Sequence, residues 1–221
     1  MSMEPWLENF ARANFRRSAD TAHDLKTPLN VAVLNLELLR MRVQKIAGGH
    51  DEKLDSYTQA IDLELRRMAR IFDAFFLMST PPKSEERTTV DVAAMAVEAA
   101  ADSGFALDET GAFAIRTHAS RIRQGLKLFF EGSTNVLRLD GRTASASRED
   151  DCYVVAVTGF PAEPGLELTK IFKFYYTDPD GNPDLSLATA RLIIETCGGE
   201  VVASQESDKV ALRLSVPPGE E

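Results

Sequence analysis

The stretch HDLKTPLNVAVLNLELLRMRVQKIAGG, residues 23–49, decides the fold of the first part of the chain. Apolar side chains recur through it at alternating steps of three and four, which places them along one face of a helix as a heptad seam. The seam starts upstream of the quoted stretch and consists of Phe15, Ser18, Ala22, Leu25, Leu29, Ala32, Leu36, Leu39, Val43 and Ile46. A seam of this length requires a partner helix.

The partner helix follows directly in the sequence. Gly48 and Gly49 end the first helix, and Asp51 is suited to cap the start of the next one. A second seam then comprises Leu54, Thr58, Ile61, Leu65, Met68, Phe72 and Phe75. The sequence therefore predicts two long antiparallel helices between residues 5 and 80.

Further apolar residues lie beside the two seams, where a single hairpin does not cover them. They are Val33, Leu34, Leu38, Tyr57, Leu63, Ile71 and Phe76. A homodimer in which two hairpins form a four-helix bundle would cover several of these side chains. The alternative is that the hairpin packs against the C-terminal part of the same chain.

The segment STPPKSEERTT, residues 79–89, marks a domain boundary, because two prolines end the helix and a polar, charged run follows. We expect a helical domain at 1–80, a linker at 81–89 and a second domain at 90–221. The second domain is expected to be an α+β sandwich with antiparallel strands. Its predicted helices are 90–104, 120–133 and 183–198, and its predicted strands are 135–147, 152–159, 199–207 and 209–217.

Composition and charge exclude several classes of function. The 221 residues carry a net charge of −9 at pH 7, which disfavours binding to nucleic acid. No apolar run approaches the ~18 residues of a membrane span, and no signal peptide is visible. Cys152 and Cys197 are far apart in the sequence and lack the spacing of metal ligands, so we expect both to be reduced thiols. We expect a cytoplasmic protein without a membrane partner.

His23 is the candidate for catalysis. It lies one position beyond the seam residue Ala22, on the flank of the helix, where a neutral imidazole is accessible and nucleophilic. Asp24 can orient the imidazole or accept its proton, and Lys26 places positive charge near a transferred phosphoryl group. Thr27 could position a water molecule, and Pro28 bends the helix at this turn.

The stripe that begins at His23 continues along the same flank through Asn30, Val33 and Glu37. A protein partner that approaches His23 would contact these residues. Val33 is apolar on an otherwise polar flank, so it is a candidate contact. Packing against a second copy of the chain explains Val33 equally well.

The chain resembles the sensor histidine kinases of two-component signalling. HDLKTPL, residues 23–29, looks like their H-box, which lies in a helical dimerisation and phosphotransfer domain. The second half resembles their ATP-binding domain of the GHKL, or HATPase, fold. SRIRQGLKLFFEGS corresponds to the N-box helix, IFKFYYTDPDG to the F-box, and LSLATARLIIETCGGEV to the last glycine box and the helix after it.

The sequence departs from that family where ATP and magnesium would bind. The N-box asparagines of the family align with Leu128 and Gly132, which cannot ligate magnesium. The first glycine box reads VTGFPAEPG, with Thr158, Gly159 and Phe160 where an adenine-binding aspartate and glycines are expected. The last glycine box reads GNPDLSLA and has Asn182, Pro183, Asp184 and Ser186. A carboxylate there repels phosphate, so we predict a degenerate HATPase domain that binds neither ATP nor magnesium.

These features predict a histidine phosphotransferase of a bacterial phosphorelay. It would exchange a phosphoryl group between receiver-domain aspartates through His23, and it would be no ATP-dependent autokinase. One alternative is a non-catalytic pseudo-histidine-kinase that binds or sequesters a kinase or response regulator. Another is a response-regulator phosphatase that uses Asp24 and Thr27, because DLKT also resembles the acid-x-x-Thr motif of such enzymes.

Overall fold

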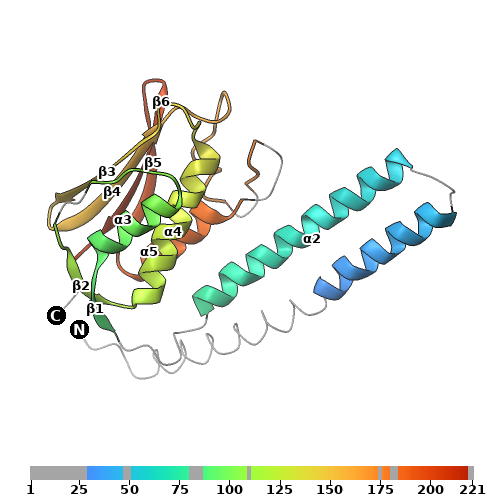
Figure 1. Ribbon diagram of the computed structural model, residues 1–221, viewed down its shortest axis with the longest axis horizontal. Coiled ribbons are helices and arrows are strands. Elements are labelled where there is room, and N and C mark those ends of the chain that lie inside the picture. Colours follow the sequence, from blue (N-terminus) through green and yellow to red (C-terminus); the bar gives the residue numbers. More distant parts are fainter. Residues whose placement is uncertain are drawn as a thin grey trace. The chain divides into compact units, whose positions relative to one another are not determined.

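The computed structural model describes residues 29–46, 51–79, 87–108, 111–173, 176–179 and 184–218. The chain separates into two compact units, Met1–Lys83 and Ser84–Glu221. The described part of the first unit is helical, and that of the second combines helices with antiparallel sheets (Figure 1).

In the first unit, the first helix (residues 29–46) and α2 (Glu52–Ser79) lie side by side and run antiparallel (Figure 1). Asp51 caps α2 as predicted, since its Oδ1 atom accepts hydrogen bonds from the backbone N–H groups of Lys53 at 3.0 Å and Leu54 at 3.1 Å. The side-chain amide of Gln44 donates to Asp55 at 2.9 Å and joins the helices close to their connection. The predicted helical hairpin is confirmed.

The first helix turns only part of its predicted seam toward α2. Leu29 is buried, and Ala32, Leu36 and Val43 are half-buried. Leu39 is 55% exposed, however, and Ile46 is exposed as well. The seam therefore divides into residues that contact α2 and residues that point away from it.

The seam of α2 divides in the same way. Thr58 is buried and Leu65 is half-buried, whereas Ile61 is 49% exposed and Met68 is also exposed. Ile61 and Met68 lie one heptad apart, as Leu39 and Ile46 do on the first helix. Each helix thus presents a repeating apolar position that its partner in the hairpin leaves uncovered.

The second unit begins with β1 (Thr88–Asp91), α3 (Val92–Asp102), β2 (Ala114–Thr117) and α4 (Ala119–Val136). It continues with β3 (Thr143–Glu149), β4 (Cys152–Gly159), α5 (Ser186–Thr196), β5 (Glu200–Glu206) and β6 (Lys209–Val216). Strands β1 and β2 form a small sheet, and the larger sheet has the order β3-β4-β6-β5. Every neighbouring pair of strands is antiparallel.

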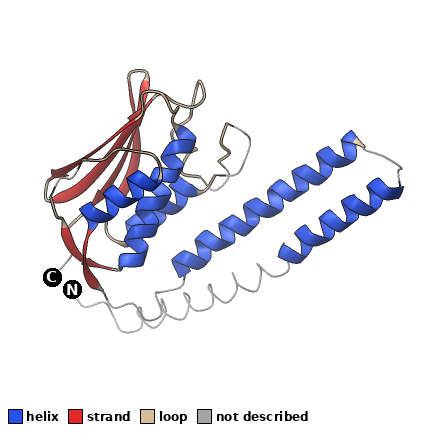
Figure 2. Cartoon of the chain, viewed as in Figure 1, coloured by secondary structure: helices blue, strands red, loops and turns tan. Residues whose placement is uncertain are grey.

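The core of the second unit lies between the sheet and the three helices α3, α4 and α5 (Figure 2). Helix α4 is amphipathic, as its apolar spacing predicts, and it contributes Phe129 and Phe130, which with Tyr153 of β4 are the largest fully buried side chains. The fully buried members of α4, β4 and β6 include Ile122, Leu126, Phe129, Phe130, Tyr153, Val155, Val157, Leu212 and Leu214.

Two boundaries differ from the sequence-based expectation. Val90 and Asp91 were expected in a helix, but they end strand β1, where Val90 pairs with Ile115 of β2. Asp91 is the N-cap of α3, and its carboxylate also accepts from the backbone N–H of Phe113 at 3.0 Å. A short strand directly before a helix leaves no alternation for sequence patterns to detect.

The strand predicted at 135–147 is wrong in its first half. Residues 135 and 136 still belong to α4, because Val136 is completely buried and the helix continues to it. The chain then turns at Asp140 and Gly141, and β3 starts only at Thr143. The φ of Gly141 is +75°, a value that suits glycine.

Among the described residues, none of the helices combines the length and the apolar character that crossing a bilayer requires.

Candidate functional site

The predicted reactive residues His23, Asp24, Lys26 and Thr27 lie outside the described residues. Their roles therefore remain predictions from the sequence. The predicted partner-binding residues Asn30, Val33 and Glu37 lie on the first helix and are described.

These three residues differ in how far they are exposed. Asn30 is exposed, while Val33 and Glu37 are half-buried. Glu37 forms an ion pair with Arg40 at 3.0 Å on its own helix. The pKa of Arg66 on α2 is raised, chiefly by its hydrogen bond to Asp62 and to a smaller extent by the charge of Glu37. Glu37 therefore lies close to α2, and Asn30 is the most accessible of the three.

In the second unit, α5 packs so closely on α4 that position 132 has no room for a side chain. A Cβ atom at Gly132 would lie 2.7 Å from Leu187 Cγ and 2.9 Å from the Leu187 backbone nitrogen. Gly125, two turns earlier, is similarly tight, since its Cβ would lie 2.9 Å from Ile194 Cδ1. Leu187 thus occupies the space that a magnesium-binding asparagine at position 132 would need.

A carboxylate of the protein itself lies at the N-terminus of α5. Asp184 is buried, and its Oδ1 atom accepts from the backbone N–H of Ser186, the first residue of α5, at 2.9 Å. Its Oδ2 atom accepts from the side-chain amide of Asn135 on α4 at 3.1 Å. Because a helix N-terminus favours negative charge, Asp184 takes the place where a phosphate would otherwise be attracted.

The segment corresponding to the first glycine box is built into the sheet. Thr158 and Gly159 are the last residues of β4, and Thr158 pairs with Thr143 on one side and Ala211 on the other. The ring of Phe160 is half-buried and lies 5.3 Å from the Lys209 ammonium. A threonine and an aromatic ring offer no carboxylate for an adenine amine. Asn182 and Pro183 of the last glycine box lie outside the described residues.

Sequence reasoning missed three residues near this region: Asn135, Glu163 and Tyr176. Asn135 and Asp184 are 49 positions apart, and nothing in the local sequence links them. Tyr176 is 6% exposed, and its hydroxyl has no hydrogen-bond partner among the described residues. Burial, followed by the charges of Glu163, Asp184 and Asp178, raises the pKa of Tyr176 to about 12, so it stays protonated in the cell.

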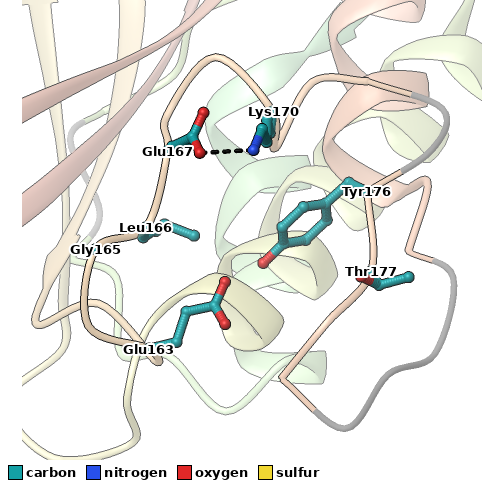
Figure 3. A pocket seen from close by; sticks show the side chains of 7 residues that line it. All are labelled: Glu163, Gly165, Leu166, Glu167, Lys170, Tyr176 and Thr177. Atoms are coloured by element: carbon teal, nitrogen blue, oxygen red, sulfur yellow. Dashed lines mark hydrogen bonds and ion pairs between the residues drawn. The ribbon is translucent and has the colours of Figure 1, made fainter.

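Tyr176 lines a cavity of about 160 Å³ in the second unit. The other lining residues are Glu163, Gly165, Leu166, Glu167, Lys170 and Thr177 (Figure 3). Glu167 and Lys170 form an ion pair at 2.6 Å, and the Tyr176 hydroxyl points into the cavity on the side of Glu163 (Figure 3). The charged lining consists of two carboxylates and one ammonium, so the cavity is acidic overall.

Comparison with known proteins identifies a domain family in the first unit and a similar overall fold. The family model for the His Kinase A (phospho-acceptor) domain matches residues 16–82. The Acinetobacter baumannii histidine kinase AdeS is structurally similar, with a TM-score of 0.53 and 17% identity over 88% of this chain and 97% of that chain. Full-length ShkA, whose structure is a complex with AMPPNP, is similar with a TM-score of 0.53 and 17% identity over 91% of this chain and 45% of that chain. At such identities the two structures show a shared fold alone. No curated protein matches the chain.

Proposed function

Because the chain is a sensor histidine kinase-like protein of two-component signalling, with an H-box in a phospho-acceptor domain and a second domain of the HATPase type, we propose that it is a histidine phosphotransferase of a phosphorelay. The phosphoryl group would arrive on the aspartate of one receiver domain and leave on another. ATP would have no part in this cycle.

The observation that carries this proposal is the packing at Gly132. A kinase of this fold requires a magnesium ligand on α4, and Leu187 fills the space for one here. The buried carboxylate of Asp184 adds negative charge at the N-terminus of α5. Both features oppose binding of a magnesium nucleotide. The H-box, in contrast, keeps both His23 and Asp24.

The proposed transfer uses residues of the H-box alone. An unprotonated imidazole nitrogen of His23 attacks the phosphorus of the receiver's aspartyl phosphate. The new N–P bond forms as the O–P bond breaks, and the receiver's carboxylate leaves with the electron pair. Asp24 holds the N–H of the other ring nitrogen and can accept its proton, while Lys26 balances charge on the phosphoryl oxygens. The reverse transfer hands the group to a second receiver.

The hairpin supports a homodimeric form of this phosphotransferase. Leu39 and Ile46 on the first helix, and Ile61 and Met68 on α2, recur at heptad spacing and remain uncovered in one hairpin. A second hairpin would bury these residues in a four-helix bundle. The receiver would then approach along the flank that contains Asn30, with Val33 and Glu37 at its edge.

Phosphotransfer can be tested with a receiver domain that carries ³²P on its aspartate. We expect label to move to the wild-type protein and to be absent from His23→Gln, because the glutamine amide is not a nucleophile for phosphorus. The parallel reaction uses γ-³²P-ATP and magnesium, from which no label should appear on the protein.

Three outcomes would contradict the proposal. Label on His23 from ATP would identify an autokinase. Release of inorganic phosphate that is lost in Thr27→Ala, without labelled protein, would identify a phosphatase. Tight binding of the receiver without either reaction would identify a sequestering pseudokinase.

A further inference from the structure

The acidic cavity of the second unit has one buried group whose hydrogen-bonding capacity is unused. Tyr176 is 6% exposed, and the described residues provide its hydroxyl with no partner. Figure 3 shows this hydroxyl directed toward the side of the cavity where Glu163 lies. A buried hydroxyl without a partner is unfavourable, so such a group points to something that binds there.

The charges around the cavity determine which charge a ligand must carry. Glu163 lines the cavity and has no hydrogen bond or ion pair with another described residue, whereas Glu167 is paired with Lys170. The nearby carboxylates of Asp178 and Asp184 add to the negative potential at the Tyr176 hydroxyl, and this potential contributes to its raised pKa. A phosphate or carboxylate ligand would be repelled, and a cation would be attracted.

The side chains around the cavity and its size favour an organic cation over a metal ion as the ligand. Within the described parts of the chain, no three His, Cys, Asp or Glu side chains converge as a metal site would require. The volume of about 160 Å³ is close to that of a cavity that holds benzene, which corresponds to a ligand of about six to eight non-hydrogen atoms.

We propose that this cavity binds a small organic cation, an amine or a guanidinium compound, whose charged N–H groups donate to the Glu163 carboxylate and to the Tyr176 hydroxyl. Leu166 supplies an apolar contact for the body of the ligand. The second domain would then bind a cation, whereas a nucleotide-binding domain of this fold binds an anion. This inference concerns the second domain alone and does not depend on phosphotransfer through His23.

The test is isothermal titration of the purified full chain at low ionic strength with benzylamine and with guanidinium. Benzyl alcohol serves as the neutral counterpart of benzylamine, and benzoate serves as the anionic one. We expect benzylamine to bind at least about ten-fold more tightly than benzyl alcohol, because the ammonium makes a charged hydrogen bond. Benzoate and magnesium ATP should not bind.

Two variants assign the site, and a third is the matched control. Glu163→Gln should weaken benzylamine binding about ten-fold, since it removes the charge that pairs with the ammonium. Tyr176→Phe should weaken it several-fold while the melting temperature of the free protein stays the same or rises, because an unpartnered buried hydroxyl is removed. Glu98→Gln removes the same charge from an exposed position of α3 and should leave affinity unchanged.

Several results would overturn the proposal. One such result is that neither benzylamine nor guanidinium produces heat up to about 10 mM. Another is that benzylamine and benzoate bind equally well. Equal affinity in Glu163→Gln and Glu98→Gln would show that any binding occurs elsewhere. A lower melting temperature of free Tyr176→Phe, with cation affinity unchanged, would assign a structural role to the hydroxyl.

Discussion

At Gly132 the interior of the second domain has room for a hydrogen atom and for nothing larger. The neighbouring atoms are Leu187 Cγ and the Leu187 backbone nitrogen, and a backbone atom cannot rotate away as a side chain can. The tight packing therefore depends on glycine at this position. The proposed loss of a magnesium ligand and the close approach of α5 to α4 would be two aspects of one arrangement.

The first prediction restores the family's asparagine at this position. Gly132→Asn should lower the free energy of unfolding by about 1–3 kcal/mol, the usual cost of overpacking, although asparagine is a better helix former than glycine. Urea denaturation measures the loss, and titration with magnesium AMPPNP should detect no binding.

Lys127→Asn is the control on the exposed side of α4. It should change stability by less than about 0.5 kcal/mol, because the ion pair of Lys127 with Glu131 at 3.6 Å is solvent-exposed. A Gly132→Asn protein that is as stable as wild type and binds the nucleotide would contradict the closed site inferred here.

At the scale of the element, each helix of the hairpin carries more apolar surface than its partner covers. The hydrogen bond from Gln44 to Asp55 joins the two helices near their connection, and Leu39 and Ile61 lie five and six residues further from it on their respective helices. Both side chains are about half exposed, at 55% and 49%. Because the uncovered positions recur every heptad, they form a continuous strip along the hairpin and not a scattered set.

The second prediction removes one layer of this strip. Leu39→Glu together with Ile61→Glu should convert the proposed dimer to a monomer, because the two hairpins of the bundle would bring four carboxylates into an apolar interface. Light scattering after size-exclusion chromatography measures the mass, and far-ultraviolet circular dichroism should show that helix content is retained.

Lys45→Gln lowers the charge at an exposed position of the first helix and should leave the dimer intact. If wild type itself has the mass of a monomer at about 10 μM, or if the double variant remains a dimer, the apolar strip has a different partner.

At the scale of the whole molecule, the two compact units differ in how they are held together. Every member of the main core cluster lies between Val90 and Val216, within the second unit. The hairpin has no comparable cluster of buried side chains among its described residues, and Leu29 is its only buried apolar residue there. The second unit therefore has a core of its own and is equipped to fold alone.

The third prediction follows for the fragment 84–221. It should unfold cooperatively in urea, with dispersed amide signals in its NMR spectrum, because it retains the entire core. Its signals should not shift on addition of magnesium AMPPNP. A fragment that lacks cooperative unfolding would show that the second unit needs the hairpin.

The sequence alone determined the hairpin, the Asp51 cap, the strand at 152–159 and the family resemblance, because periodic apolar spacing and capping residues act locally. It missed β1 and β2, since strands this short contain too few residues for a visible alternation. It also extended a strand back to residue 135, where burial of Val136 keeps the helix going. In the second case, contacts distant in sequence outweigh the local preference for a strand.

For the candidate site, the sequence by itself predicted the H-box around His23 and the loss of the nucleotide ligands, because both predictions need only the residue identities at motif positions. Only the tertiary structure decided which side chains lie together in the second unit. Three pairs of residues come together from separate segments of the second unit, namely Gly132 and Leu187, Asn135 and Asp184, and Glu163 and Tyr176. Shape, buried charge and unused hydrogen-bonding capacity exist only once the chain has closed on itself, so no reading of adjacent residues could reveal them.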